Sequence, residues 1–351
     1  MNYKLAKEYG LENKLKRSKN MKKIIFSLML VVLILGVLVG CGNKGTSNDS
    51  NGKMRVALLL PGSINDGSWN TAAYNGLKEM EAKGDFEIAF TEKVAVNDIE
   101  EAFMNYARTG YDLVIGHGFE FGEPALRVAK DFPEVNFYVS GKAPENAEIG
   151  KNVGFIDQKE FEGAYLAGVL AGLMTESNKV GYVGGMKIPI QIANYNAFEA
   201  GAKSVNPDVK ILGVLTGTFE DPGKGKEAAL AQIDNGADII AQAADSTGVG
   251  AIEAAKANNI KLIGYGTDQS DLAPTLFLTC FFSDIPKAIG MQGDKIKEGS
   301  FGGDVWKAGI KEGIVDITKF GDSVPADIAA KVNAIKQDII DGKIKVPEIY
   351  Q

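Results

Sequence analysis

A polar and aromatic cluster follows the first apolar stretch that has the character of a strand. In LLLPGSINDGSWNTAAYNGL, residues 58–77, Asp66, Trp69 and Asn70 stand where this strand ends and a helix begins. Such turns collect ligands in open α/β sheets, because strand carboxyl ends and helix N-termini converge there. The indole can stack on a flat ligand, and the carboxylate can accept hydrogen bonds from its N–H groups. The cluster therefore predicts a small-molecule site.

Aromatic and acidic residues recur after later strand-like runs of the chain. One by one, packing explains the rings and helix capping explains the acids, and Asp221, just before Pro222, is interpreted as a helix N-cap outside the site. Jointly, they fall on the carboxyl edges of two predicted sheets that face each other across a cleft. They predict a site for a planar, nitrogen-rich molecule. Its expected ligand-binding residues are Asp66, Trp69, Asn70, Phe119, Phe219, Asp245 and Asp268.

Signatures of catalysis and of cofactor binding fail on inspection. The glycines of GHGFEFG, residues 116–122, have the wrong spacing for a dinucleotide loop, and no acid ends the next strand. The segment DPGKGKEA, residues 221–228, lacks the first glycine and the Ser or Thr of a phosphate loop. His117 is the only histidine, and it fits a pocket lining and a structural loop equally well. We therefore predict no catalytic residue and no cofactor.

Composition limits the classes of partner. The 351 residues suffice for two domains, and the net charge is −7. Without the first forty residues, 30 basic and 43 acidic side chains remain, a net charge of −13. This acidity argues against nucleic acid as a partner and against a polybasic membrane-binding patch. Cys280, in the apolar run LFLTCFF, is interpreted as a buried free thiol, and one histidine without paired thiols argues against a metal site.

The N-terminal region has the pattern of a secretory signal. From Met21 the chain reads MKKIIFSLMLVVLILGVLVGCG, in which two lysines precede an apolar run. The segment LVGC resembles the bacterial lipobox, so Cys41 is expected to be the lipidated first residue of the mature protein. The alternative, a single transmembrane helix, is at the short limit of length. We expect residues 1–20 to be a non-native upstream extension, 21–40 a signal peptide and 41–53 a flexible tether.

The rest of the chain alternates between apolar strands and amphipathic helices. Such a pattern predicts parallel sheets covered on both faces, and it restarts near residue 160, so two doubly wound units are expected. The predicted fold class is α/β, with two Rossmann-like lobes and a hinge. The first lobe is assigned residues 54–157 plus 281–304, and the second 158–280 plus 305–351.

Several stretches together resemble the basic membrane protein family, which comprises substrate-binding lipoproteins of ATP-binding-cassette importers and includes purine nucleoside receptors. The resemblance covers about residues 54–320. It implies a type I periplasmic-binding-protein architecture, with three crossovers between the lobes and a ligand enclosed when they close. The stretches that carry it are NDGSWNTAAYNGL, DLVIGHGFEF, VGFIDQKEFEGAYLAGVLAGLM, VGYVGGM, FEDPGKGKEAALAQIDNGADIIAQAADSTGVGAIEAAK and IGYGTDQ.

The resemblance also implies roles for single residues. Trp69 stands where the family often has a stacking Phe, and Phe219 would be the opposing ring. Two positions depart from the nucleoside-binding pattern: Gly266 replaces an acid of G-x-D-x-D-Q, and Ser283 stands near a common Lys. Those two side chains resemble a ribose clamp. Their loss, with Asp245 kept in a TDS-like segment, favours a free purine base over a nucleoside.

Three functions remain open from the sequence. The first is a lipid-anchored, extracytoplasmic receptor, monomeric and without enzymatic activity, that binds a purine base or nucleoside and delivers it to an ABC transporter permease in the cell membrane. The second is a receptor of the same fold for a sugar or a signalling molecule, since sugar sites also use rings and carboxylates. The third is an exported nucleoside-processing enzyme, in which Asp245 or Asp268 would act as acid or base.

Overall fold

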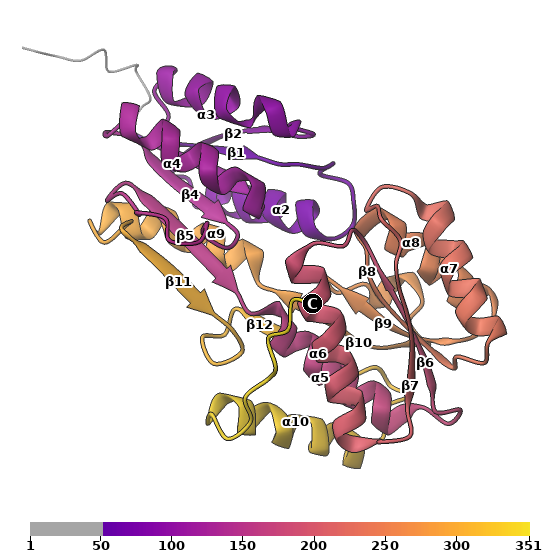
Figure 1. Ribbon diagram of the computed structural model, residues 1–351. Coiled ribbons are helices and arrows are strands. Elements are labelled where there is room, and N and C mark those ends of the chain that lie inside the picture. The colour runs from indigo at the N-terminus through magenta and orange to yellow at the C-terminus, as the bar shows by residue number, and fades with distance from the viewer. Residues whose placement is uncertain (1–51) are drawn as a thin grey trace, which may run out of the picture. The chain divides into compact units, whose positions relative to one another are not determined.

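The computed structural model describes residues 52–351. The predicted upstream extension, the signal peptide, Cys41 and most of the tether lie outside these residues. The described part of the chain contains two six-stranded sheets, each with helices on both faces (Figure 1). None of its helices is long and apolar enough to span a bilayer.

The first sheet has the order β11-β5-β4-β3-β1-β2, and all neighbouring strands are parallel. Its strands are β1 (Met54–Leu59), β2 (Phe86–Thr91), β3 (Leu113–His117), β4 (Asn136–Ser140), β5 (Val153–Gln158) and β11 (Asp304–Ala308). One face packs on α2 (Trp69–Ala82) and α9 (Ile285–Lys297), and the other packs on α3 (Ile99–Arg108) and α4 (Gly122–Asp131). We call this sheet with its four helices the first lobe.

The second sheet has the order β12-β10-β9-β8-β6-β7, and only β12 is antiparallel to its neighbour. Its strands are β6 (Lys179–Gly184), β7 (Lys210–Leu215), β8 (Ile239–Ala243), β9 (Lys261–Tyr265), β10 (Phe277–Ser283) and β12 (Val315–Ile317). The helices α5 (Glu160–Met174), α6 (Pro189–Val205) and α10 (Ala326–Ile340) cover one face. The other carries α7 (Pro222–Asp234) and α8 (Asp245–Ala257). This is the second lobe.

The predicted fold class is confirmed, because both lobes have parallel cores with the same strand order. The chain passes between the lobes three times, after β5, after β10 and after β11. Two crossings differ from the assigned boundaries. β10 belongs to the second sheet through Ser283, and Asp304–Ala308 pairs with β5 in the first. Strand pairing decides these positions, and an apolar pattern does not show which sheet a strand joins.

Two local predictions are confirmed. The Asp221 side chain caps α7, where it accepts a hydrogen bond from the backbone N–H of Lys224 at 3.2 Å. The Cys280 thiol is buried, and this burial raises its pKa to about 12. Cys280 is therefore an inert core residue.

Helices α5 and α6 pack unusually closely because glycines face the neighbouring backbone. A Cβ on Gly168 would lie 2.0 Å from the Phe198 carbonyl oxygen, and one on Gly201 would lie 2.1 Å from the Tyr165 carbonyl oxygen. We expect Gly168→Ala to lower the free energy of unfolding by about 1–3 kcal/mol, because the backbones must separate. Urea denaturation followed by circular dichroism measures this change.

Gly290 in α9 provides the matched control. A Cβ there has only the Lys83 Nζ as a neighbour, at 4.0 Å, so it meets open space. Gly290→Ala should raise the free energy of unfolding by up to about 1 kcal/mol, because alanine favours helix. The same sign for both substitutions would contradict the close-packing explanation.

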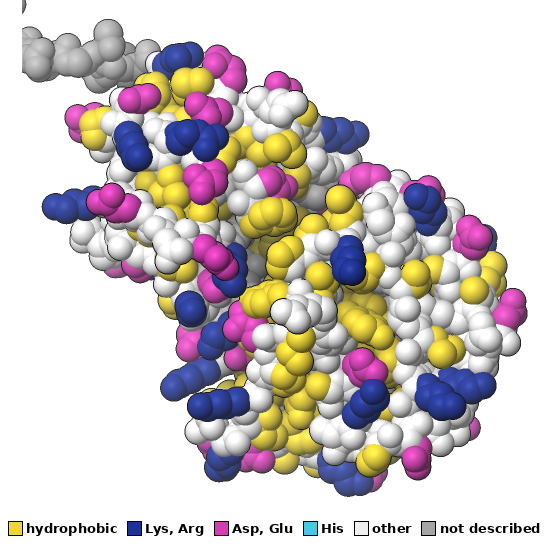
Figure 2. All heavy atoms as spheres, viewed as in Figure 1, with side chains coloured by type: hydrophobic (Ala, Val, Ile, Leu, Met, Phe, Trp, Pro, Cys, Tyr) yellow, Lys and Arg dark blue, Asp and Glu magenta, His cyan; other side chains and the backbone are white. Residues whose placement is uncertain are grey.

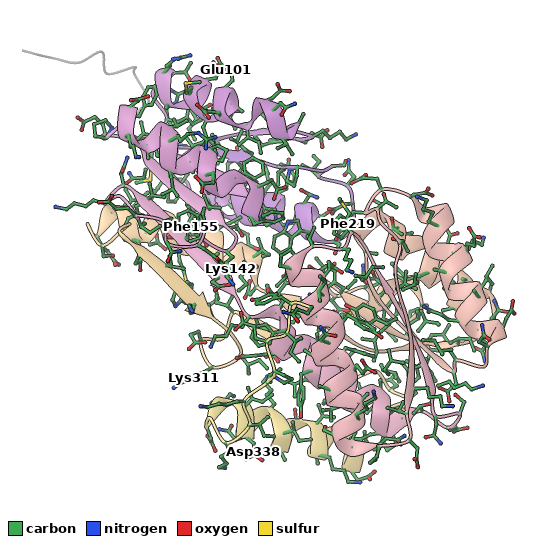
Figure 3. The ribbon with its side chains drawn as sticks, viewed as in Figure 1. Glu101, Lys142, Phe155, Phe219, Lys311 and Asp338 are labelled. Carbon is green, nitrogen blue, oxygen red and sulfur yellow. The ribbon has the colours of Figure 1, made fainter. Side chains whose placement is uncertain are left out.

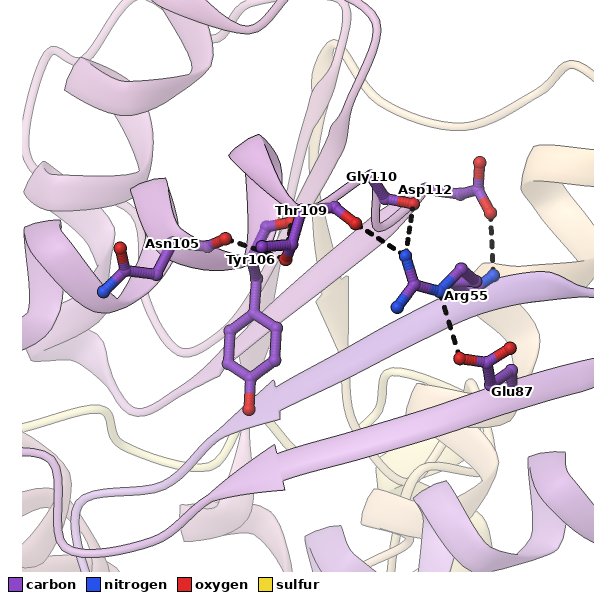
Figure 4. A network of polar contacts seen from close by, with 7 residues as sticks. All are labelled: Arg55, Glu87, Asn105, Tyr106, Thr109, Gly110 and Asp112. Carbon is purple, nitrogen blue, oxygen red and sulfur yellow. Dashed lines mark hydrogen bonds and ion pairs between the residues drawn. The ribbon is translucent and has the colours of Figure 1, made fainter. Parts of the chain in front are cut away.

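A polar network closes the amino edge of the first sheet (Figure 4). The Arg55 guanidinium donates to the carbonyl oxygen of Thr109 at 2.6 Å and to Glu87 Oε1 at 3.1 Å. The backbone N–H of Arg55 donates to Asp112 Oδ2 at 2.7 Å. These bonds fix the loop between α3 and β3. The carboxyl edge, at the other end of the strands, holds the polar residues of the candidate site.

Candidate functional site

Asp66 organises the turn between β1 and α2. Its buried carboxylate accepts five hydrogen bonds, so both of its oxygens are engaged within the turn. The donors are the backbone N–H groups of Ser68, Asn70 and Thr71, the Asn70 amide and the Thr71 hydroxyl, at 2.7–3.0 Å. The arrangement satisfies the free N–H groups at the start of α2. Asp66 thereby sets the geometry of this helix end.

Asn70 completes the same turn. Its amide donates to Asp66 Oδ2 at 2.7 Å, and its Oδ1 accepts from the backbone N–H of Gly62 at 3.2 Å. A Cβ on Gly62 would lie 2.5 Å from the Asn70 amide nitrogen, so the turn requires a glycine there. Asp66 and Asn70 therefore hold the loop that carries Trp69.

The half-buried Trp69 indole stacks on the His117 imidazole. The ring centroids are 4.2 Å apart, and the planes differ by 21°. His117 is the last residue of β3, the strand next to β1, and its side chain is fully buried. One face of the indole is thus covered from within the first lobe.

The environment of His117 defines its protonation. Nε2 lies 3.2 Å from the Trp69 carbonyl oxygen, which can only accept, so Nε2 carries the proton. Burial lowers the pKa of His117 to about 4 and keeps the ring neutral near pH 7. Its Nδ1 is buried and has no hydrogen-bond partner among the described residues. It is an idle acceptor beside the indole.

Asp245 connects the second lobe to the same helix end. The backbone N–H of Trp69 donates to Asp245 Oδ1 at 3.4 Å. Asp245 follows β8 with φ at 47°, a left-handed conformation that non-glycine residues rarely adopt and that is typical of functional sites. Burial, together with the nearby charge of Asp66, raises its pKa to about 7. A hydrogen-bonding group that is costly to ionise thus lies at the lobe boundary.

Further hydrogen bonds cross the boundary close by. The Ser68 hydroxyl donates to the Tyr265 carbonyl oxygen at 3.3 Å, and the Thr267 hydroxyl donates to the Gly67 carbonyl oxygen at 3.2 Å. A Cβ on Gly266 would lie 2.2 Å from the Ser68 hydroxyl oxygen. The family pattern has an acid at position 266, but the space for its side chain is filled here by Ser68 of the first lobe.

The remaining predicted residues are placed differently. Phe219 is half-buried in the second lobe, near the first, and its ring lies where a Cβ of Gly185 would stand (Figure 3). Phe119 is 50% exposed in the short 3-10 helix Phe119–Phe121. Asp268 is exposed, and its carboxylate accepts from the backbone N–H of Ser270 at 3.0 Å. Hydrogen bonds therefore join Asp66, Trp69, Asn70 and Asp245, and these three residues lie outside that network.

Both halves of this cluster lie at topological switch points. In the first sheet β1 and β3 are neighbours whose following helices lie on opposite faces, and Trp69 and His117 stand at their carboxyl ends. In the second sheet Asp245 follows β8, which neighbours β6 in the same way. Open α/β sheets bind ligands at this crevice. On the face seen in Figure 2, hydrophobic side chains gather along the line where the lobes meet.

Sequence reasoning gave three participants no specific role and left one open. Ser68 belonged to the predicted polar loop but had no partner to suggest a role, Tyr265 belonged to an apolar run, and Glu160 ended the polar segment DQKE, residues 157–160. His117 was open between pocket and structure. Within residues 52–351, no three His, Cys, Asp or Glu side chains are grouped to hold a metal ion.

Two lobes of this topology, with polar groups at facing switch points, are the architecture of ABC transporter solute-binding proteins. The structure matches an ABC transporter solute-binding protein from Conexibacter woesei with a TM-score of 0.74 and 29% identity, over 85% of this chain and 100% of that one. The chain belongs to the Bmp family of PnrA-like ABC transporter substrate-binding proteins, whose model matches residues 53–350. The resemblance found in the sequence is confirmed.

Two curated relatives have names that specify a ligand. The ABC transporter nucleoside-binding protein BmpA of Lactococcus lactis is 30% identical, over 93% of this chain and 99% of its own length. A purine-binding protein of Brucella abortus is 30% identical, over 90% of this chain and 88% of its own length. Both relatives are binding proteins, and members of the family serve ABC transporters on the extracytoplasmic side.

Proposed function

We propose that this chain is the lipid-anchored receptor of an ABC importer and that it binds a purine base or nucleoside between its lobes. One observation carries the proposal: the Trp69 indole is backed by His117 on one side, while its backbone N–H bonds Asp245 of the other lobe. A flat ring at the lobe boundary is thus held in place before a ligand arrives. The names of the two relatives support a purine.

The site residues divide into two roles in this proposal. Trp69 stacks on the ligand ring, Phe219 is the opposing ring, and Asp245 accepts hydrogen bonds from ligand N–H groups. Asp66 and Asn70 shape the turn, since their polar atoms are engaged there. The exposed Phe119 and Asp268 contribute at the solvent side. Ligand binding favours the form in which the lobes are closed, because only that form contacts the ligand from both sides.

Lipidation at Cys41 and delivery to a permease belong to the same proposal. The signal, the LVGC segment and the polar tether support an anchor on the extracytoplasmic face of the cell membrane. We propose a monomeric receptor without enzymatic activity. Unchanged adenosine and inosine after incubation with the purified protein are the expected result, and hydrolysis of either one would contradict it.

The decisive experiment identifies the natural ligand. Native mass spectrometry of freshly purified protein should show an added mass that matches a purine base or nucleoside and disappears after denaturation and refolding. Calorimetry with adenine, adenosine and ribose then ranks the candidates. A copurified sugar or an unrelated metabolite, with no heat from either purine, would overturn the purine assignment and leave the receptor class intact.

A further inference from the structure

The three crossings between the lobes meet at the first turn of α5. The first crossing leads directly into this turn, and the backbone N–H of Lys159 donates to the Ala308 carbonyl oxygen at the third crossing, at 2.8 Å. Glu162 Oε2 accepts from the backbone N–H of Ile310, also at the third crossing, at 2.8 Å. The Ser283 hydroxyl, at the second crossing, donates to Glu160 Oε1 at 3.2 Å. The backbone and side chains of one helical turn thus connect all three hinge segments.

Glu160 also connects this hinge to the lobe boundary. Its Oε2 accepts from the Tyr265 hydroxyl at 3.1 Å and from the Asn194 amide at 3.1 Å. The carbonyl oxygen of the same Tyr265 accepts from the Ser68 hydroxyl of the first lobe. A continuous path of contacts therefore runs from Ser68, next to Trp69, through Tyr265 to Glu160 and on to the second crossing.

The charge of Glu160 makes these contacts energetically important. The side chain is 2% exposed, and no Lys or Arg of the described residues forms an ion pair with it. Three neutral donors replace the water that an ionised carboxylate would otherwise bind. Removing one buried partner leaves part of that desolvation uncompensated. The carboxylate therefore favours the hinge arrangement that presents all three donors together.

The network also contains unused hydrogen-bonding capacity. The Tyr182 hydroxyl and Asn194 Oδ1 are buried without partners among residues 52–351. Burial raises the pKa of the Tyr182 hydroxyl, and the charge of nearby Glu160 raises it further. An idle donor beside a carboxylate allows a second set of hydrogen bonds when the hinge segments move. A hinge that changes between two arrangements needs such alternatives.

We propose that Glu160 is the positioning residue of the hinge, and that its bonds to Ser283 and Tyr265 set the balance between open and closed lobes. This inference goes beyond the proposed function, because it concerns the movement of the lobes and holds for any ligand. Glu160 contacts no ligand in this proposal. Its carboxylate stabilises the arrangement in which Ser68 reaches Tyr265 and Trp69 reaches Asp245.

The test measures the opening of the lobes in the absence of ligand. The chain has two tryptophans, so Trp306→Phe leaves Trp69 as the only fluorescent indole. In that background, Glu160→Gln and Ser283→Ala should each raise the acrylamide quenching constant of Trp69 about twofold or more, because open lobes expose the indole. Glu199→Gln, on the surface of α6 and paired with Lys203, is the control and should leave quenching unchanged.

The outcomes separate a hinge role from a purely structural one. A structural role would lower the urea midpoint of both variants and leave the quenching of the folded protein unchanged, and this would overturn the proposal. If Glu160→Gln does not fold, Ser283→Ala decides, since it removes one donor and keeps the carboxylate. Because no ligand is added, a failure to bind adenine would refute the purine assignment without affecting this result.

Discussion

Trp69→Ala is expected to weaken adenine binding by about 10- to 100-fold, the effect of removing an aromatic ring on which a base stacks. His117 covers one face of the indole, so the substitution also exposes its buried imidazole. We expect no neighbouring ring to replace the indole in stacking on the base. The Asp66 cap does not involve the indole, so the helix end should keep its shape. Isothermal titration calorimetry of both proteins with adenine measures the change.

Trp306→Ala provides the control for this experiment. Trp306 is half-buried in the edge strand β11, which β5, β4 and β3 separate from β1, and its ring centroid lies 5.2 Å from the Lys295 ammonium. Trp306→Ala removes the same type of side chain from the edge of the sheet. It should therefore lower the free energy of unfolding and leave adenine affinity unchanged. Equal affinity in Trp69→Ala and in the unmodified protein, when the latter binds adenine, would refute the stacking role.

Asp245 and His117 are expected to give the protein two opposite pH dependences. Asp245 has its pKa raised from 3.8 to about 7, so its buried ionised form destabilises the folded state increasingly between about pH 4 and 7, on the order of 4 kcal/mol. His117 has its pKa lowered from 6.5 to about 4, so the unfolded chain gains a proton first as the pH falls through this window. That costs on the order of 3 kcal/mol of stability at low pH.

The two effects largely cancel in the unmodified protein and separate in its variants. Relative to it, Asp245→Asn should become increasingly stable as the pH rises from 4 to 7, and His117→Gln as the pH falls from 6.5 to 4. Asn suits both the left-handed backbone and the bond from the Trp69 N–H. Urea midpoints measured at half-unit pH steps give both curves.

Other buried acids have a smaller influence on this comparison than burial itself. Burial also raises the pKa of Glu160, which is present in all three proteins, and the charge of Glu160 is the smallest of the causes that raise the pKa of Asp245. Two difference curves with slopes of the same sign, or two flat curves, would show that burial does not perturb these groups as described. Stability differences that change in opposite directions with pH are the specific result expected from these two buried groups.

The fold was predictable because its signals are local. Apolar strands alternating with helices predicted two doubly wound lobes, and Asp221 before Pro222 predicted the cap of α7. The boundaries at the second and third crossings were missed by a few residues. Pairing of β11 with β5 joins residues about 150 apart in sequence, and no short pattern encodes such a partner.

The position of the candidate site could be proposed from the sequence, but the contacts within it could not. A turn after β1 that contains Asp66 and Trp69 predicted a binding edge, and the edge is where both lobes meet. The sequence did not show that the Asp66 carboxylate accepts its hydrogen bonds from the start of α2, because helix capping and ligand binding use the same residue type. The role of Glu160 depends on Ser283, 123 residues away in sequence.

The late return of the chain to the first lobe has a consequence for biosynthesis. Helix α9 and strand β11 complete that lobe, with Ile285, Ala288 and Ile289 in the same apolar core as Leu58 and Leu77. A ribosome or secretion channel that releases the chain from its amino end therefore cannot deliver a finished first lobe until residue 308 has emerged. The second lobe is also completed late, by β12 and α10, so both lobes depend on the last segments of the chain to emerge.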